Sequence, residues 1–357
     1  TGGTVFLAAL AYPVSLAQSE DAFYGYIAIA PAVLIVTLIS AFRGWFMGNG
    51  NLVPNSVSQI TEGAVKLGVG LGLTAFLIRF GIKYAVVGVV ASEFVTLIIM
   101  TICYFVKHKK FERIKLKEEK GTIKRLACLA VPLVACGTIL PVSQFIDSVL
   151  VTNLLKWGGK AGPIAQYGLW SGVVTPLINL PVMVCISLGI AVTPQMVEGK
   201  QKRDIDFILE KAATANKLTY LMGVPFVFFY LFMAGGIIKL LFPSLSEEQT
   251  KTAVMLLMIG APSVIGLSVF QIYSAMLQGL GRAKAPVIIM GTCMAVKLAL
   301  TVILTPVMGI MGCAIAAVVG YLGSGIWITV YFANFAALDA EYAKNASLIT
   351  LCGVIMG

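Results

Sequence analysis

Residues 42–71 read FRGWFMGNGNLVPNSVSQITEGAVKLGVGL, and the rest of the chain can be understood from this stretch. It opens with Arg43 and a turn rich in Gly, Asn and Pro, and then enters an apolar run with helical spacing. Much later, residues 270–300 read FQIYSAMLQGLGRAKAPVIIMGTCMAVKLAL, and the tetrapeptide AVKL that contains Lys66 recurs around Lys297. The similar turn before each tetrapeptide and the apolar run after it predict a duplicated helical architecture.

The composition of the chain indicates a membrane protein. Of its 357 residues, 59% are hydrophobic and only 12% are charged, whereas soluble domains carry about 25% charged residues. Apolar runs of about 20 residues recur along the chain, and each is long enough to cross a bilayer as a helix. The short alternating segments of a membrane barrel are absent from the sequence. We therefore predict an all-α, polytopic membrane protein.

Apolar segments recur along the whole sequence, and an eleventh begins near residue 347. The first ten are 3–17, 24–42, 56–79, 84–106, 122–155, 166–198, 214–241, 252–278, 285–308 and 310–336. The two longest contain Pro132, Pro141, Pro176 and Pro181, where we expect kinks, because a proline frees a helical carbonyl that neighbouring groups must satisfy.

The net charge of +10 comes from loops between apolar segments rather than from a basic surface for nucleic acid. The loops alternate between the two sides of the membrane, and those on one side are far richer in Lys and Arg. The positive-inside rule assigns that side to the cytoplasm. That side holds Arg43, 107–125, 200–203, Arg282, Lys284 and Lys344. The predicted domains are an N-terminal lobe (1–106), a basic cytoplasmic linker (107–125), a C-terminal lobe (126–336) and a last segment (337–357).

Motifs for enzymatic chemistry are missing from the sequence. The seven cysteines lie inside apolar runs or at their edges, without the spacing of metal ligands, and the single histidine, His108, sits in a basic loop. The chain contains no GxxxxGK[ST], GxSxG or HExxH motif. We therefore expect no enzyme, no cofactor and no bound ATP. An ion gradient, the membrane potential or substrate supply would have to drive transport, and Na⁺ and H⁺ both stay open as the coupling cation.

Ionisable side chains inside apolar runs are costly and are the first candidates for function. Gln59, Glu62 and Lys66 follow one another at i, i+3 and i+7, on one helix face. Glu62 and Lys66 have the favourable order for a local ion pair, and two interpretations stay open: a pair that stabilises its own helix, or the wall of an aqueous cavity that meets a headgroup. Arg43 at a helix end is explained either by snorkelling or by a role in substrate gating.

The second half of the chain repeats the lysine without its neighbouring acid. At the position that matches Glu62 stands Cys293, so Lys297 is expected either to contact a phosphate or to find its partner on another helix. Gln144 and Asp147 lie one turn apart on a single face of an apolar run. Asp147 is interpreted as a cavity-facing site for a cation or proton, or as a hydrogen-bonded contact between helices.

Residues 42–67, 141–151 (PVSQFIDSVLV) and 277–287 (LQGLGRAKAPV) resemble the stage V sporulation protein B branch of the polysaccharide and lipid II flippase family, within the multidrug/oligosaccharidyl-lipid/polysaccharide superfamily. The resemblance covers nearly the whole chain. It implies about fourteen helices, in two six-helix lobes and a C-terminal pair, and transport by alternating access. On this basis the chain is an internal fragment that lacks the first two helices and ends at the start of the C-terminal pair.

The resemblance implies a flippase of the bacterial cytoplasmic membrane that translocates a lipid-linked oligosaccharide, such as a peptidoglycan, spore-cortex or other polysaccharide precursor. The implied partners are a lipid-linked sugar diphosphate, membrane lipids and envelope-synthesis proteins, with no nucleic acid. Arg43, Lys66 and Lys297 would contact phosphates. Sugar hydroxyls or a coupling cation would be met by Gln59, Glu62, Gln144 and Asp147.

Two functions other than that of a flippase are considered from the same residues. A cation-coupled multidrug antiporter of the same superfamily would use Asp147 and Glu62 to exchange protons or sodium for an organic cation. A non-transporting scaffold of envelope synthesis would need no ionisable residues in both halves. The lysines at matched positions favour the flippase, since an anionic headgroup needs cations.

Overall fold

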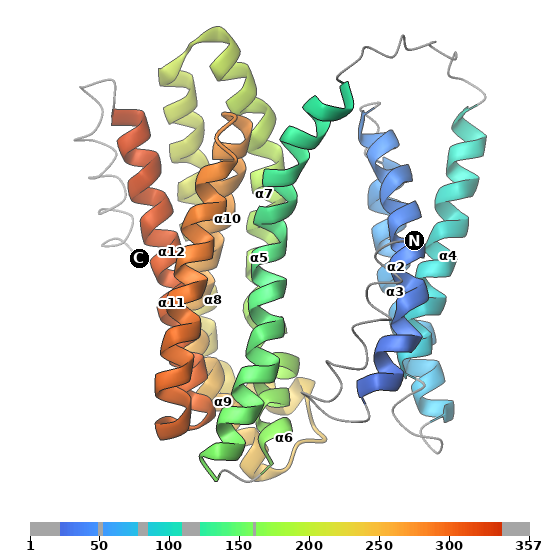
Figure 1. Ribbon diagram of the computed structural model, residues 1–357, viewed down its shortest axis with the longest axis vertical. Helices are drawn as coiled ribbons and strands as arrows, with labels where there is room; N and C mark the ends of the chain where they lie inside the picture. Colours follow the sequence, from blue (N-terminus) through green and yellow to red (C-terminus); the bar gives the residue numbers. More distant parts are fainter. Residues whose placement is uncertain (1–21, 49–52, 78–84, 109–121, 160–161, 338–357) are drawn as a thin grey trace. The chain divides into compact units, whose positions relative to one another are not determined.

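The protein is helical throughout the part that its computed structural model describes, which is residues 22–48, 53–77, 85–108, 122–159 and 162–337, and these ranges contain no strand. The helices are α2 (Ala22–Gly48), α3 (Val53–Leu77), α4 (Ala85–His108), α5 (Thr122–Trp157), α6 (Pro163–Gly168), the π-helical turn η3 (Leu169–Val174), α7 (Thr175–Lys202), α8 (Ile205–Leu241), α9 (Glu247–Gly260), α10 (Ser263–Gly279), α11 (Lys284–Met308) and α12 (Ile310–Ala337) (Figure 1). The all-α prediction is confirmed. The segments expected at 3–17 and from 347 onward lie outside the described residues.

The helices have the length and apolarity of membrane spans. Five of those described are long and apolar enough to cross a bilayer, and α9 with α10 adds a sixth if this pair, bent by 46°, counts as one span. Helix α8, with 37 residues, is about 55 Å long, so its ends extend past a hydrocarbon core of about 30 Å. Helices α2 and α4 contain shorter apolar stretches, Pro31–Phe46 and Val90–Val106.

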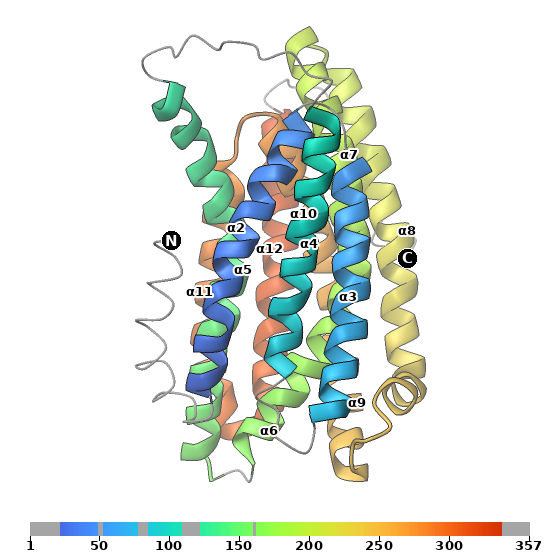
Figure 2. The same ribbon diagram turned by 90° about the vertical axis from the view of Figure 1, so that its right-hand side faces the viewer.

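Contacts divide the chain into two compact units, Thr1–Glu118 and Glu119–Gly357, called unit 1 and unit 2 below. In unit 1, α4 packs against both α2 and α3, and Figure 2 shows the three helices side by side. Tyr104 of α4 forms ring contacts with Phe42 and Trp45 of α2, at centroid distances of 5.3 and 4.9 Å. These aromatic contacts join the end of α2 to α4. The predicted boundaries of linker and lobes stay a prediction, because residues 109–121 lie outside the described ranges.

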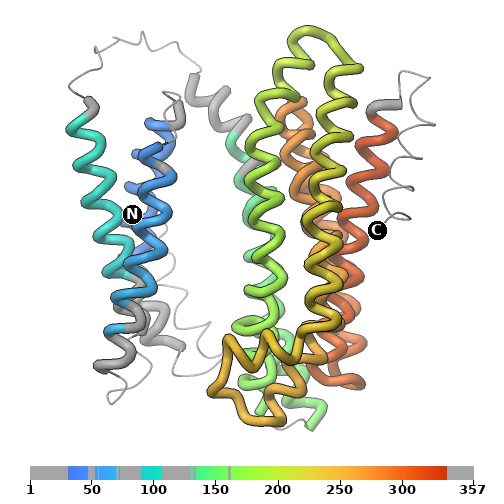
Figure 3. Tube along the Cα trace, turned by 180° about the vertical axis from the view of Figure 1, so that it is seen from behind, coloured from blue at the N-terminus to red at the C-terminus, as the bar shows by residue number. Residues whose placement is uncertain are grey.

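In unit 2, α10 is the central helix and packs against α7, α8 and α12. Glycines let it approach α12 closely: a Cβ on Gly266 would lie 2.5 Å from the Tyr321 carbonyl oxygen, and one on Gly325 would lie 2.7 Å from the Gly266 oxygen. Backbone contact through small residues is the usual way in which membrane helices associate. Helices α7 and α8 form a long hairpin on the opposite side of α10 (Figure 3).

The duplication predicted from the AVKL repeat appears in the packing of two helix triplets. In α2–α3–α4 the third helix packs extensively against the first and second, which hardly touch each other. The triplet α10–α11–α12 has the same pattern. Lys66 lies on the middle helix of the first triplet and Lys297 on the middle helix of the second. The sequence repeat thus corresponds to a repeated structural unit.

Prolines in α7 leave backbone carbonyls without their usual helical hydrogen bond, and other groups supply it. Pro181 has no N–H for the carbonyl of Leu177 four residues earlier, and the buried hydroxyl of Tyr230 on α8 donates to that carbonyl at 2.6 Å. This bond satisfies a freed carbonyl inside the membrane, as expected for a proline in a span.

Upstream of Pro176 the helix widens into η3, where the N–H of Thr175 bonds the carbonyl of Trp170 five residues back. The Thr175 hydroxyl donates to the same carbonyl at 2.9 Å. Helices α9 and α10 meet at a bend of 46° beside Pro262, which was not among the expected kinks. The kinks expected at Pro132, Pro141, Pro176 and Pro181 stay predictions.

Candidate functional site: two lysine-centred ion-pair clusters

The first cluster joins the three described helices of unit 1. The ammonium of Lys66 lies 2.5 Å from Glu62 Oε1 on its own helix and 2.8 Å from Glu93 Oε1 on α4. The other oxygen of Glu62 accepts from the Arg43 guanidinium of α2 at 2.8 Å, and Arg43 Nε donates to Ser58 Oγ at 3.1 Å. The predicted local pair between Glu62 and Lys66 is therefore present, and it is one part of a network across α2, α3 and α4.

This cluster is electrically balanced and partly open to its surroundings. It contains two cations and two anions, and the side chains of Arg43 and Lys66 are 24% and 37% exposed, against 8% for Glu93. Gln59 is exposed on the same helix, outside the network. Sequence reasoning missed Glu93, although it is the one acidic residue in the 24 of α4; an isolated acid in an apolar run is itself a signal of function or pairing.

The second cluster lies in the interior of unit 2. The Lys297 ammonium on α11 donates to Asp147 Oδ2 and, at 3.1 Å, to Ser143 Oγ, both on α5. The ammonium also lies 5.6 Å from the ring centroid of Tyr321 on α12, within the range of a cation–π contact. The side chains of Lys297 and Asp147 are 1% and 3% exposed. The lysine that has no acid on its own helix thus finds one on another helix.

Tight packing holds this pair in place. A Cβ on Gly320 of α12 would lie 2.8 Å from Lys297 Cβ, so only a glycine lets α12 pass so close to the lysine stem. Gln144, which shares a helix face with Asp147 in the prediction, is exposed, and its carbonyl accepts a hydrogen bond from Tyr167 Oη at 3.1 Å. Asp147 accordingly faces α11, and the exposed Gln144 side chain is in hydrogen-bond contact with Tyr321 of α12.

The two clusters are not copies of one another. Lys66 and Lys297 are 231 residues apart. At the same offset, Arg43 corresponds to Ser274, Glu62 to Cys293 and Glu93 to Ser324. Unit 2 therefore lacks both acidic partners of Lys66, and the arginine that pairs with one of them, at the matching positions. Its lysine is instead compensated by an acid on α5, a helix outside the repeated triplet.

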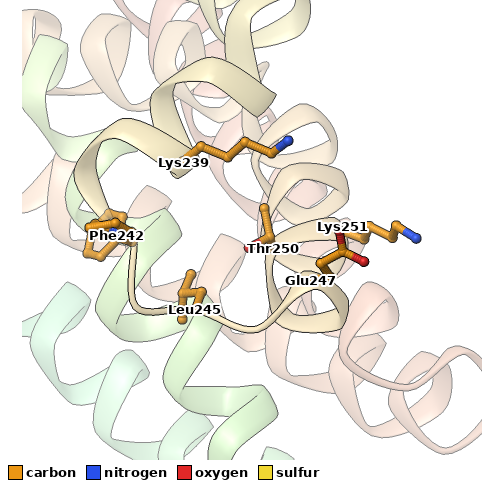
Figure 4. A pocket seen from close by; sticks show the side chains of 7 residues that line it. Lys239, Phe242, Leu245, Glu247, Thr250 and Lys251 are labelled. Atoms are coloured by element: carbon orange, nitrogen blue, oxygen red, sulfur yellow. The ribbon is translucent and has the colours of Figure 1, made fainter.

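Two pockets of unit 2 lie apart from the clusters, and neither is lined by a sequence-predicted site residue. A cavity of about 310 Å³ at the turn from α8 to α9 is lined by Lys239, Phe242, Pro243, Leu245, Glu247, Thr250 and Lys251. Figure 4 shows the ammonium groups of Lys239 and Lys251 on the side of this turn away from Phe242. A groove of about 560 Å³ on α5 and α11 is apolar apart from Asn153, whose side chain bonds the Val149 carbonyl.

Metal and thiol chemistry find no support in the described ranges. No group of three or more His, Cys, Asp or Glu side chains there is arranged to hold a metal ion. Cys103, Cys136, Cys185, Cys293 and Cys313 are free thiols. The chemistry that the arrangement offers is electrostatic, with cations that are paired with carboxylates in this state.

The fold, with ion pairs inside its apolar helices, is similar to that of solved membrane transporters of the MOP superfamily. It is similar to an inward-facing multidrug resistance MATE family transporter, with a TM-score of 0.76 at 13% identity, over 96% of this chain and 78% of that one. A MOP superfamily transporter from Pyrococcus furiosus Vc1 (DSM3638), described as having a binding pocket of reverse polarity, matches with a TM-score of 0.70 at 15% identity, over 96% and 76%. At these identities the likeness shows the fold.

The family is shown by sequence. The model of the lipid II flippase MurJ family matches residues 4–352, and the chain belongs to this family. It is 27% identical to stage V sporulation protein B of Bacillus subtilis (strain 168), over 96% of this chain and 68% of that protein. It is 22% identical to the lipid II flippase MurJ of the same organism, over 92% and 63%. The chain is a multi-pass protein of the bacterial membrane, and the resemblance inferred from its motifs is confirmed.

Proposed function

We propose that this chain is the transport part of a flippase that translocates a lipid-linked oligosaccharide across the bacterial cytoplasmic membrane by alternating access. Membership of the lipid II flippase family supports the reaction class. The main structural support is the cluster of Arg43, Glu62, Lys66 and Glu93 in unit 1. Its two cations lie inside apolar helices and are partly exposed.

The chemistry of this cluster suits a diphosphate headgroup. A guanidinium binds phosphate oxygens through two parallel hydrogen bonds, and an ammonium supplies a compact positive charge beside it. A diphosphate would compete with Glu62 for both cations, because the two oxygens of Glu62 occupy Arg43 and Lys66. We therefore place the phosphate contacts on Arg43 and Lys66, and give the exposed Gln59 and Gln144 contacts with sugar hydroxyls.

Lys297 is not given a phosphate contact in this proposal. Its side chain is 1% exposed and its ammonium already meets a carboxylate, a hydroxyl and an aromatic ring. An incoming headgroup would have to open the contact between α5 and α11 to reach it.

The alternative is a cation-coupled multidrug antiporter, which is favoured by the fold shared with MATE transporters. An antiporter that binds organic cations needs an acid that is free to exchange partners. Within the described apolar runs, Glu62, Glu93 and Asp147 each pair with a lysine. This compensation favours the flippase.

A reconstituted flipping assay on the full-length protein tests the proposal. Proteoliposomes would carry a fluorescent lipid-linked disaccharide diphosphate, and flipping would be measured for wild type, Arg43→Ala and Lys66→Ala at matched protein content. Lys202→Ala is the control, since Lys202 is 66% exposed and pairs only with Glu198 one turn away. We expect at least a tenfold loss for the first two variants and no loss for the control.

The contrary result is equally defined. Wild-type flipping rates in Arg43→Ala and Lys66→Ala would exclude the phosphate contacts. If Asp147→Ala alone abolished transport, and the wild type exchanged an organic cation for Na⁺ or H⁺, the antiporter would replace the flippase.

A further inference from the structure

We propose that Lys297 determines the ion dependence of transport, because its ammonium permanently occupies the carboxylate site in unit 2 where a coupling metal cation would otherwise bind. Transport by this protein then requires no Na⁺. The inference rests on the proposed function only in assuming that the chain is a transporter, and it concerns which ion is bound rather than which substrate is moved.

The groups around the ammonium are those of a monovalent cation site. Asp147 Oδ2 and Ser143 Oγ accept from Lys297 Nζ, and the face of Tyr321 lies on another side. Carboxylate and hydroxyl oxygens are the ligands that hard cations prefer. A further oxygen, Asp147 Oδ1, is buried without a partner among the described residues. Two oxygens from one turn of α5 thus hold the tethered cation, and the second carboxylate oxygen of Asp147 belongs to the same buried group.

The tethered cation cannot leave easily. Lys297 is 1% exposed, and moving its ammonium away would leave the buried Asp147 carboxylate uncompensated, which is strongly unfavourable in a low-dielectric interior. Its aliphatic stem is fixed by close contact with α12 at Gly320. An ion from solution would therefore have to displace a cation that is covalently attached and already in place.

The described helices of unit 1 offer no open carboxylate site either. Lys66 bridges Glu62 and Glu93, and Glu62 also binds Arg43. Each acid found inside the described apolar runs thus has a lysine as its direct partner. Lys297 differs from Lys66 in being fully buried, which makes it the residue that closes its site permanently.

The first experiment measures Na⁺ binding by the purified full-length protein, without any lipid substrate. Thermal unfolding in detergent would be compared in NaCl and in choline chloride at equal ionic strength. We expect no Na⁺-specific shift of Tm for the wild type. In Lys297→Met the vacated oxygens of Asp147 and Ser143 should bind Na⁺ and raise Tm by about 2–4 °C relative to choline. The double variant Asp147→Asn/Lys297→Met should lose this shift, and Lys239→Met, which changes an exposed lysine of α8, should behave as wild type.

The second experiment needs no variant and so does not depend on the folding of Lys297→Met. Flipping by wild-type proteoliposomes would be measured with NaCl replaced by choline chloride on both sides, and the rate should stay within twofold. A several-fold loss of rate would overturn the proposal, as would a Na⁺-specific rise in wild-type Tm that Asp147→Asn abolishes. Absence of a Na⁺ shift in folded Lys297→Met would also overturn it. If no lipid-linked glycan were flipped at all, the proposed function would fail while the Tm comparison still decided the ion dependence.

Discussion

Lys297 of α11 donates a hydrogen bond to Asp147 of α5, and neither side chain is more than 3% exposed. Removing one partner leaves a buried charge uncompensated, so Lys297→Met should destabilise unit 2 by about 3–5 kcal/mol. Replacing both in Asp147→Asn/Lys297→Met removes both charges, and the double variant should be more stable than Lys297→Met alone. Thermal unfolding of wild type, Asp147→Asn, Lys297→Met and the double variant in detergent gives the coupling energy. Additive losses would show that the two side chains do not interact.

The two lysines of the repeat should differ in their effect on stability. Lys66 is 37% exposed, so solvent and the remaining cation Arg43 can compensate part of the change in Lys66→Met. We expect a smaller loss there than for Lys297→Met, because only one of the two acids that Lys66 contacts, Glu93, is buried. Yield and Tm of the two variants, purified in parallel, provide the measurement. Equal losses of stability in the two variants would contradict the prediction that burial sets the cost of removing the lysine.

Gly320 should not tolerate a methyl group. Gly320→Ala would place Cβ 2.8 Å from Lys297 Cβ and 3.4 Å from the Cys293 carbonyl, so α12 must shift away from α11. Overpacking of this kind costs about 1–3 kcal/mol. Gly323→Ala on the same helix is the matched control, since its Cβ would find only Cys293 Sγ at an ordinary 3.9 Å. The control should be neutral or slightly stabilising, because alanine favours a helix over glycine. The order of the two Tm values checks this.

The hydrogen bond from Tyr230 to the Leu177 carbonyl should depend on Pro181. Tyr230→Phe leaves a buried carbonyl unsatisfied in wild type and should cost about 1 kcal/mol. In a Pro181→Ala background the new N–H can bond the same carbonyl, so the Tyr230→Phe substitution should then cost less than half as much. A double-mutant cycle by thermal unfolding measures the difference. The same cost in both backgrounds would mean that the hydroxyl stabilises the protein by another route.

Much of the candidate site could be predicted from local spacing. Glu62 and Lys66 are one helical turn apart, so their pairing follows from the geometry of a helix. The absence of an acid before Lys297 correctly indicated a partner on another helix or a ligand. The choice between Asp147 as an open cation site and as a contact between helices required coordinates, since it depends on which face of α5 meets α11. Glu93 was overlooked because it has no charged neighbour at helical spacing on its own helix.

The sequence by itself determined that this is an all-α membrane protein with a duplicated helical architecture, because apolar length and the AVKL repeat are properties of the chain that need no knowledge of packing. Its motifs also sufficed to indicate the flippase family. Only the tertiary structure decided which charges are paired and how deeply. Lys66 and Lys297 lie in two copies of the tetrapeptide AVKL. Lys66 bridges two acids of unit 1 and is partly exposed, whereas Lys297 is buried and pairs with Asp147. The physical reason is that burial and charge compensation depend on the neighbouring helices, and the repeat does not preserve those partners.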